Sequence, residues 1–405
     1  MANTPEIRFR GFREPWEQRK VAEITKFHKQ GFYTTEDYNE NKKYYLLRGT
    51  DLTENKLVLK DTPKIDATEK DYAAFKTEIG DFLIVRSGTV GTYGIVDVDI
   101  PAIFGSYLID FRFDMEQVTN EFFGYFYQSN LFKLQLNKII QASANTNINA
   151  ENIKSTVISL PCLEEQRKIS NYLGKIDNLI TLHQRKYDEI KEVKKYMLQK
   201  MFPKNGEKVP EIRFSGFTAS WEQRKLGEVS DSYSGGTPTV GVKEYYGGQI
   251  PFIRSAEINS DCTELFITDD GLKNSSARLV SKGDILYALY GATSGEVGRA
   301  RLNGAINQAI LAIKPYSGYD YEFISQWLRK SKQSIIETYL QGGQGNLSGT
   351  IVKDLVVQFP TLPEQEVIGT YFANLDHLIT LHQHKCDELK EVKKFMLQNM
   401  FPRRG

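Results

Sequence analysis

The residues with the most obvious capacity for chemistry are two histidines and a cysteine, spaced as His382-x-His384-x-Cys386. Imidazole and thiolate groups are typical zinc ligands. The surrounding pattern predicts a helix, and residues two positions apart on a helix point to different faces. His382 and Cys386 also fall in an apolar periodic row, so we interpret them as packing residues and expect no bound metal.

A second segment, GATSGEVG at residues 291–298, has the glycines of a phosphate-binding loop but no lysine. A nucleotide-binding P-loop requires G-x-x-x-x-G-K-[ST]. The chain also has no Asp/Asn-Pro-Pro-aromatic sequence, and Cys162, Cys262 and Cys386 share no CxxC spacing. We therefore expect reduced thiols, no catalytic residues and no cofactor held by this chain.

The elements that must position any functional side chains occur twice. Residues 178–203 return at 377–402 with 20 of 26 positions identical, and 5–20 returns at 210–225. The stretches between these copies are similar in length but divergent in sequence. A period of about 200 residues indicates a duplicated domain rather than a solenoid. Two related halves with a pseudo-twofold axis and neighbouring termini are expected, as in a fused dimer.

The near-identical copies each predict one long helix with a heptad pattern. The two helices are expected to pack antiparallel as a coiled-coil spacer, each roughly 50 Å long at 1.5 Å per residue. The polar positions are repeated as well as the apolar ones, which favours a partner surface present twice. The predicted seam includes Ile176, Leu179, Ile190 and Met197 in the first helix, and Leu375, Leu378, Leu389 and Met396 in the second.

The divergent stretches each read as an α/β domain. Short apolar runs such as 80–88 and 283–291 predict strands, and amphipathic stretches at 121–140 and 321–340 predict helices. The fold class is thus α/β, with two tandem domains joined by the two long helices. The expected boundaries are 1–163 for the first domain with its N-terminal repeat segment, 164–208 for the first helix, 209–362 for the second domain, and 363–405 for the second helix.

Composition fits a water-soluble protein. The chain is 40% hydrophobic, has a formal net charge of +1, and has no apolar run of the roughly 18 residues that a membrane span needs. Its N-terminus does not read as a signal peptide, so we expect a cytoplasmic protein without membrane contact. The near-neutral charge means that any nucleic-acid binding requires clustered basic groups or charge from partners.

The order of these features resembles the specificity subunit of type I restriction-modification enzymes. The resemblance covers essentially all 405 residues. It rests on the duplicated frame, on LPCLEEQRKI at 160–169 with FPTLPEQEVI at 359–368, and on SGGTPT at 234–239 with GGQIPFI at 247–253. The first domain departs from the pattern, with HKQGFYTTEDY where the second has SYSGGTPTVGVKEYY.

The resemblance implies a non-catalytic subunit that reads double-stranded DNA. Each α/β domain would be a target recognition domain for one half of a bipartite, asymmetric site. The long helices would set the half-site spacing and dock two copies of a methyltransferase subunit, and two restriction subunits would join the full complex. S-adenosylmethionine, ATP and Mg²⁺ are expected on these partners, which methylate adenine or cleave DNA.

Candidate DNA contacts follow from residue type: arginine and lysine suit guanine edges, and hydroxyl and aromatic groups suit the sugar and phosphate. Asn147 and Asn346, in the loops before the last strand of each domain, are better explained as turn residues. The candidates are Tyr33, Lys42, Lys43, Tyr44, Tyr45, Arg48, Arg86, Ser87 and Tyr93 in the first domain, and Ser234, Thr237, Thr239, Lys243, Tyr245, Arg254, Ser255, Tyr290, Thr293 and Ser294 in the second.

Two other classes of function remain open at this point. A stand-alone nuclease or methyltransferase would need a metal or cofactor motif that the sequence does not contain. A scaffold that bridges two proteins without reading DNA would agree with the near-neutral charge and the long helices. It predicts that loss of the chain leaves DNA modification unchanged.

Overall fold

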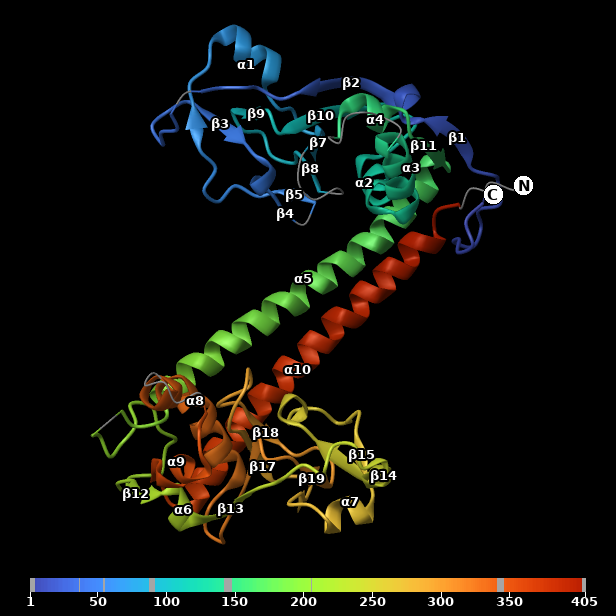
Figure 1. Ribbon diagram of the computed structural model, residues 1–405. Coiled ribbons are helices and arrows are strands. Elements are labelled where there is room, and N and C mark those ends of the chain that lie inside the picture. Colours follow the sequence, from blue (N-terminus) through green and yellow to red (C-terminus); the bar gives the residue numbers. More distant parts are fainter. Residues whose placement is uncertain are drawn as a thin grey trace. The chain divides into compact units, whose positions relative to one another are not determined.

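The computed structural model describes residues 4–35, 37–53, 55–86, 92–141, 148–204, 206–340 and 346–402. The chain forms two compact units (Figure 1). The first comprises residues up to His183 and those from His384 onward, and the second comprises Gln184–Gln383. Each long helix therefore contributes one part to each unit.

The first unit contains an antiparallel-rich sheet in the order β2-β10-β7-β8-β5-β4 and a smaller sheet in the order β6-β3-β9. Its strands β3 and β9 pair in parallel. The elements are β1 Glu17–Lys20, η1 Val21–Ile24, β2 Thr25–Gln30, β3 Tyr44–Leu47, η2 Gly49–Asp51, β4 Leu52–Thr53, β5 Lys56–Leu57, β6 Lys64–Ile65, α1 Glu69–Phe75, β7 Phe82–Val85, β8 Tyr93–Ile95, β9 Ala102–Phe104, β10 Leu108–Phe113, α2 Asn120–Gln128, α3 Asn130–Gln141, α4 Ala150–Lys154, β11 Val157–Leu160 and α5 Leu163–Lys200.

The second unit has a similar order of elements. Its sheets run β13-β20-β17-β18 and β15-β14-β19-β16, and β14 and β19 are again parallel. The elements are β12 Glu222–Lys225, α6 Leu226–Val229, β13 Ser230–Ser234, η3 Lys243–Tyr245, β14 Tyr246–Ile253, η4 Ser255–Glu257, β15 Phe266–Ile267, α7 Asp269–Lys273, β16 Arg278–Val280, β17 Ile285–Ala288, β18 Val297–Arg299, β19 Gly304–Ile306, β20 Ile310–Pro315, α8 Tyr321–Leu340, α9 Gly349–Asp354, β21 Val356–Phe359 and α10 Leu362–Asn399. The predicted α/β class with two long helices is confirmed.

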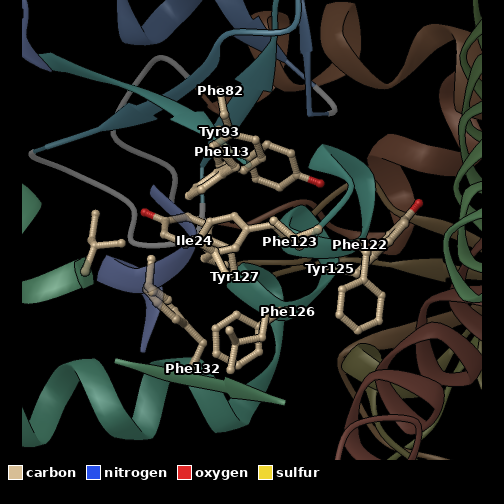
Figure 2. Packing of buried hydrophobic residues seen from close by; sticks show 14 of the residues in the cluster. Ile24, Phe82, Tyr93, Phe113, Phe122, Phe123, Tyr125, Phe126, Tyr127 and Phe132 are labelled. Atoms are coloured by element: carbon tan, nitrogen blue, oxygen red, sulfur yellow. The ribbon is translucent and has the colours of Figure 1, made fainter. Parts of the chain in front are cut away.

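Aromatic side chains dominate the core of the first unit (Figure 2). Phe82 stacks on Tyr93 with ring centroids 4.6 Å apart, and Phe123 meets Phe82 edge-on at 5.2 Å. Such contacts add to the stabilisation that comes from burial alone. This core fixes α2 and α3 against one face of the larger sheet.

The segment 121–140, which the sequence predicts as one helix, is two. Ser129 ends α2 and precedes α3, because its hydroxyl donates to the carbonyl of Phe126 at 2.6 Å and accepts from the amide of Phe132 at 3.2 Å. One serine thus caps both helix ends. The equivalent segment of the second unit, α8, is continuous from Tyr321 to Leu340.

Within each unit, parts of α5 and α10 lie side by side and antiparallel. In the first unit Lys393 pairs with Asp177 at 2.6 Å, and in the second Lys194 pairs with Asp376 at 2.5 Å. Each aspartate also accepts a hydrogen bond from the domain helix, from Tyr125 in the first unit and from Gln326 in the second. The same set of contacts therefore joins domain and spacer twice.

Of the predicted seam residues, Ile176 is buried, Met197, Leu375, Leu389 and Met396 pack against the two cores, and Ile190 is half-buried. The seam prediction is wrong at Leu179 and Leu378, which are 44% and 38% exposed. A helix turns 100° per residue, so only one of two adjacent apolar residues can face inward. Ile180, next to Leu179, packs against the core instead.

The repeated Glu-Gln pair near the start of each long helix, Glu165-Gln166 in α5 and Glu364-Gln365 in α10, connects that helix to its domain. Arg8 contacts both carboxylate oxygens of Glu165, and Arg213 does the same to Glu364. Gln166 accepts from the amide of Thr119, just before α2. Gln365 accepts from the amide of Asp320, just before α8. The sequence similarity at these positions thus has a structural cause.

Candidate nucleic-acid interface

In the first unit, two segments meet beyond the ends of the parallel strands β3 and β9. The amide of Phe32 donates to the carbonyl of Phe104 at 2.8 Å, and Gly31 lies so close to Gly105 that a Cβ would sit 2.0 Å from its carbonyl oxygen. Only glycine permits this approach of two backbones. It places Tyr33, 75% exposed, at this edge beside the turn that carries Tyr107, 67% exposed.

The second unit builds the same edge with other side chains. The amide of Gly236 donates to the carbonyl of Ile306 at 3.2 Å, and a Cβ on Gly235 would lie 1.8 Å from the Ile306 carbonyl oxygen. Thr237, which follows, donates its hydroxyl to Oε1 of Gln308 at 2.5 Å. We call these two places the reading edges. The first comprises Tyr33, Arg48, Arg86, Ser106 and Tyr107, and the second comprises Thr237, Arg254, Tyr290 and Gln308.

An arginine ends the parallel strand at each reading edge. Arg48 follows β3 and Arg254 follows β14, and their side chains are 40% and 39% exposed. In both cases the arginine amide donates to the carboxylate three residues later, Asp51 at 2.7 Å and Glu257 at 3.0 Å. These carboxylates also accept from Thr62 and Thr263.

Charge pairing fixes these arginines in place. Arg254 binds Glu257 at 2.9 Å and Glu264 at 2.7 Å, and these hydrogen bonds raise the Arg254 pKa. Burial alone would raise the pKa of Glu257, but hydrogen bonds from Arg254 and from backbone amides lower it to about 2. Arg48 lies 3.6 Å from Asp51 and donates to the carbonyl of Asp61 at 2.9 Å. Both arginines are held by acidic groups yet remain partly exposed.

A groove of about 580 Å³ in the first domain is lined by residues of segments 38–41 and 60–64, and the predicted contacts are not among its lining residues. Lys42 donates to the carbonyl of Asp37, Lys43 lies over the ring of Tyr44, and Tyr45 lies under Lys64. The backbone amide of Arg86, after β7, bonds to the carbonyl of Tyr107 at 2.8 Å, which places Arg86 at the reading edge.

In the second domain the structure divides the predicted residues. Ser234, Ser255 and Tyr290 lie at the strand ends that form the reading edge, and Tyr290 bridges Asn346 through the backbone. Lys243 and Tyr245 lie at the end of β14 that is far from Arg254. Thr239 lies in the loop that connects β13 to η3. Thr293 and Ser294 form the turn after Gly291, where the Ser294 hydroxyl donates to the Gly291 carbonyl.

Two predicted contacts are wrong because their side chains are in cores. Tyr93 is 3% exposed, is stacked on Phe82, and accepts a hydrogen bond from Gln128 (Figure 2). Tyr44 is buried and stacked on Tyr72 with centroids 4.1 Å apart. Ser87 and Asn147 lie outside the described residues.

Sequence reasoning did not single out Tyr107 or Gln308. Both follow the last strand of the parallel pair, in FGSYL and INQAI. The signal that identifies them is the pairing of β3 with β9 and of β14 with β19, which places residues from distant segments together. That pairing cannot be read from local pattern.

A second candidate surface lies on the long helices. Apolar side chains remain exposed at matching positions of α5 and α10, spaced so that they share one face of each helix. In the first unit these are Leu179, Leu182, Val392 and Phe395, and in the second Leu378, Leu381, Val193 and Tyr196; together we call them the helix stripe. Exposed apolar groups in such a repeated pattern are typical of a protein interface.

The described residues contain no group of three or more His, Cys, Asp or Glu side chains arranged to hold a metal. Among them there is also no helix long and apolar enough to cross a membrane. His384 lies 3.4 Å from Glu388, and Cys386 is buried.

The chain matches the family model described as the type I restriction modification DNA specificity domain, over residues 13–192 and again over 219–391. A relative from Methanocaldococcus jannaschii, named as the MjaX type I restriction enzyme specificity subunit, is 23% identical over 400 residues, covering 94% of this chain and 91% of the relative. The EcoR124I/EcoR124II specificity subunit of Escherichia coli is 23% identical over 167 residues, covering 39% and 41%.

Solved structures share the fold. The S subunit of a type I restriction-modification system from M. genitalium has a TM-score of 0.68 at 16% identity, covering 99% of this chain and 100% of that one. A chain from a study of type I restriction-modification assembly has a TM-score of 0.52 at 17% identity, covering 94% and 96%.

Proposed function

Because this chain belongs to the type I restriction-modification DNA specificity domain family, we propose that it directs such an enzyme to one bipartite, asymmetric DNA site. Each α/β domain reads one half of the site in double-stranded DNA. The observation that carries this proposal is that one backbone frame, repeated in both units, holds different side chains at its reading edge. Two reading edges that share a backbone frame but carry different side chains suit two half-sites of different sequence.

The chemistry of the reading edges supports base contact. The first edge offers two exposed tyrosines and two arginines, and the second offers a threonine, a glutamine, an arginine and a half-buried tyrosine. Arginine matches the acceptors of guanine and glutamine matches the edge of adenine in the major groove. With a formal net charge of +1, the chain offers little general attraction for phosphates, so partner subunits supply much of it.

The helix stripe docks the methyltransferase subunit. Its residues occur in two matching sets of four, one in each unit, so two copies of one partner bind two equivalent surfaces. Each set of four combines exposed leucine, valine and aromatic side chains. Aromatic side chains that become buried on binding contribute much of the binding energy in many interfaces. The equality of the sets follows from the near-identity of 178–203 and 377–402.

The long helices also set the distance between half-sites. Each has 38 residues, which corresponds to roughly 57 Å at 1.5 Å per residue. This exceeds the ~34–36 Å of one DNA turn. Half-sites separated by several unread base pairs agree with a spacer of this length.

The chain itself is not catalytic in this proposal. S-adenosylmethionine is bound by the methyltransferase subunits, and ATP and Mg²⁺ by two restriction subunits of the complete assembly. The complex acts in the cytoplasm, where it methylates adenine or cleaves unmodified DNA.

The test is the adenine methylome of a restriction-free host that expresses this chain with its methyltransferase partner, compared with the partner alone. A bipartite methylated motif that requires this chain is the expected result. An unchanged methylome, with both proteins shown to be soluble and associated, would instead favour a scaffold that does not read DNA.

A further inference from the structure

The two reading edges can be superposed residue by residue through their backbone hydrogen bonds. Phe32 and Gly236 donate to equivalent carbonyls, Phe104 and Ile306, so Tyr33 and Thr237 occupy the same next position. The turn after β9 is closed by the amide of Leu108 on the carbonyl of Gly105 at 2.8 Å. The turn after β19 is closed by Ile310 on Asn307 at 3.3 Å.

These equivalences align Ser106 with Gln308, each the first central residue of its turn. The frame therefore presents two side-chain positions together at each edge. They hold Tyr33 and Ser106 in the first unit and Thr237 and Gln308 in the second. The backbone is shared, while the four side chains differ in size, and the amide of Gln308 differs from the three hydroxyl groups in hydrogen-bonding capacity.

In the second unit the two positions are coupled. The Thr237 hydroxyl donates to Oε1 of Gln308 at 2.5 Å, and both side chains are exposed. This bond orients the amide, because it assigns the oxygen to the side of Thr237. Oε1 keeps a second lone pair and Nε2 keeps its donors, which is the donor-acceptor set that pairs with N6 and N7 of adenine.

The surroundings favour a base rather than a phosphate as the ligand of Gln308. The amide of Asn307, one residue before Gln308, donates to the carbonyl of Ile253, one residue before Arg254. Arg254 is paired there with two carboxylates, Glu257 and Glu264. This cluster has one cation and two anions, so it repels a phosphate. A base edge is uncharged and is not repelled, so the neutral amide of Gln308 can contact it.

We infer that two positions in each domain determine which DNA sequence is read: 33 and 106 in the first domain, and 237 and 308 in the second. In the second domain, Gln308, oriented by Thr237, reads an adenine of the second half-site. This inference rests on the proposed DNA-reading function. It adds which side chains decide the sequence and which base one of them selects.

The experiment uses the full-length chain with its methyltransferase, and the readout is the methylated motif in a restriction-free host together with methylation rates on matched duplexes. Gln308→Ala is expected to lower discrimination for adenine at one position of the second half-site by roughly 10- to 100-fold. Gln308→Glu, which accepts but does not donate, is expected to shift that position toward cytosine. Thr237→Val is expected to weaken discrimination at the same position.

A double exchange, Thr237→Tyr with Gln308→Ser, places the first domain's pair in the second domain and should change the second half-site alone. Gln249→Ala is the control, because Gln249 is an exposed glutamine of β14, which belongs to the same sheet as β19. The first half-site serves as an internal control in every variant.

The outcomes separate this inference from the proposed function. If the native chain directs no motif, the DNA-reading function itself fails. If the native chain directs a motif that Gln308→Ala and Gln308→Glu both leave unchanged, the function stands and the inference is overturned. Loss of both half-sites in the Gln308 variants, with Gln249→Ala fully active, would also overturn it by assigning Gln308 a role in folding or assembly.

Discussion

Arg8 holds Glu165 with two parallel hydrogen bonds of 2.7 and 2.8 Å, and the Glu165 side chain is 1% exposed. The pair joins the N-terminal segment to the start of α5. Arg213 and Glu364 repeat it in the second unit with two bonds of 2.7 Å. The duplicated sequence frame is thus tied to each domain by the same buried ion pair.

Arg8→Ala should destabilise the first unit by about 3–5 kcal/mol, because it leaves a buried carboxylate without its partner. Urea unfolding gives the size of the effect, and hydrogen exchange in the first turns of α5 locates it. Arg213→Ala should produce the same loss in the second unit. Arg10→Ala, at an exposed position, is the control; equal stability of Arg8→Ala and Arg10→Ala would contradict the prediction.

Leu179→Glu should leave stability within about 0.5 kcal/mol of the native chain, since Leu179 is exposed. It should instead weaken binding of the methyltransferase subunit, measured by calorimetry or pull-down with defined stoichiometry. Ile176→Glu, three residues earlier and buried, should cost roughly 3 kcal/mol or more. An unfolded Leu179→Glu protein would show that the seam includes this leucine after all.

A buried carboxylate should make the first unit sensitive to pH. Burial raises the pKa of Asp110 to about 8, the Asp81 carboxylate adds to this shift, and Arg112 opposes it. An aspartate in the unfolded chain titrates near pH ~3.9. The folded state therefore retains a proton that the unfolded state loses, so native stability should fall as pH rises from about 4 to about 8.

Asp110→Asn should remove this dependence. Its melting temperature should exceed that of the native chain by a margin that grows from pH 5 to pH 8. Asp231→Asn, at an exposed position on β13, provides the control. Parallel curves for the native chain and Asp110→Asn would refute the prediction. The second unit has Ala312 where the first has Asp110, so it should lack this contribution.

Arg254→Ala should reduce methylation through the second half-site alone, with a loss of about 1–3 kcal/mol in discrimination, as expected for the loss of a contact between a guanidinium and a base. Arg254→Lys should not restore it, because an ammonium cannot reproduce the planar pairing with Glu257 and Glu264. The measurement is methylation of duplexes that differ in one half-site. An equal effect on both half-sites would assign Arg254 to folding or assembly.

The sequence predicts the parts of this fold that depend on local pattern. The duplication, the two long helices and the α/β domains follow from periodicity and repetition. Sequence pattern could not decide whether Leu179 or Ile180 faces the core, because both residues are apolar. That choice depends on the surface against which the helix packs. Tyr93 and Tyr44 were misplaced for a similar reason: tyrosine suits both a core and a DNA surface.

The candidate site was only partly accessible to sequence reasoning. Arg48, Arg254, Tyr33 and Thr237 were predicted from residue type and lie at the reading edges. Their neighbours Tyr107 and Gln308 join them only through the parallel pairing of strands more than 50 residues apart. The pairing of Arg254 with Glu264 could not be predicted from the sequence either, because a turn brings the two residues together rather than helical or strand spacing.

The division of the chain into units also constrains how it is made. The second unit is one continuous segment, Gln184–Gln383, whereas the first needs the residues from His384 onward. At ~5–20 residues per second, a ribosome takes about 10–40 s to synthesise the intervening 200 residues. During that time Leu173 and Ile176 lack the helix that brings Leu389 and Met396 against the same core. The domain synthesised first is therefore the one completed last, and it depends on the other half of the chain having already emerged.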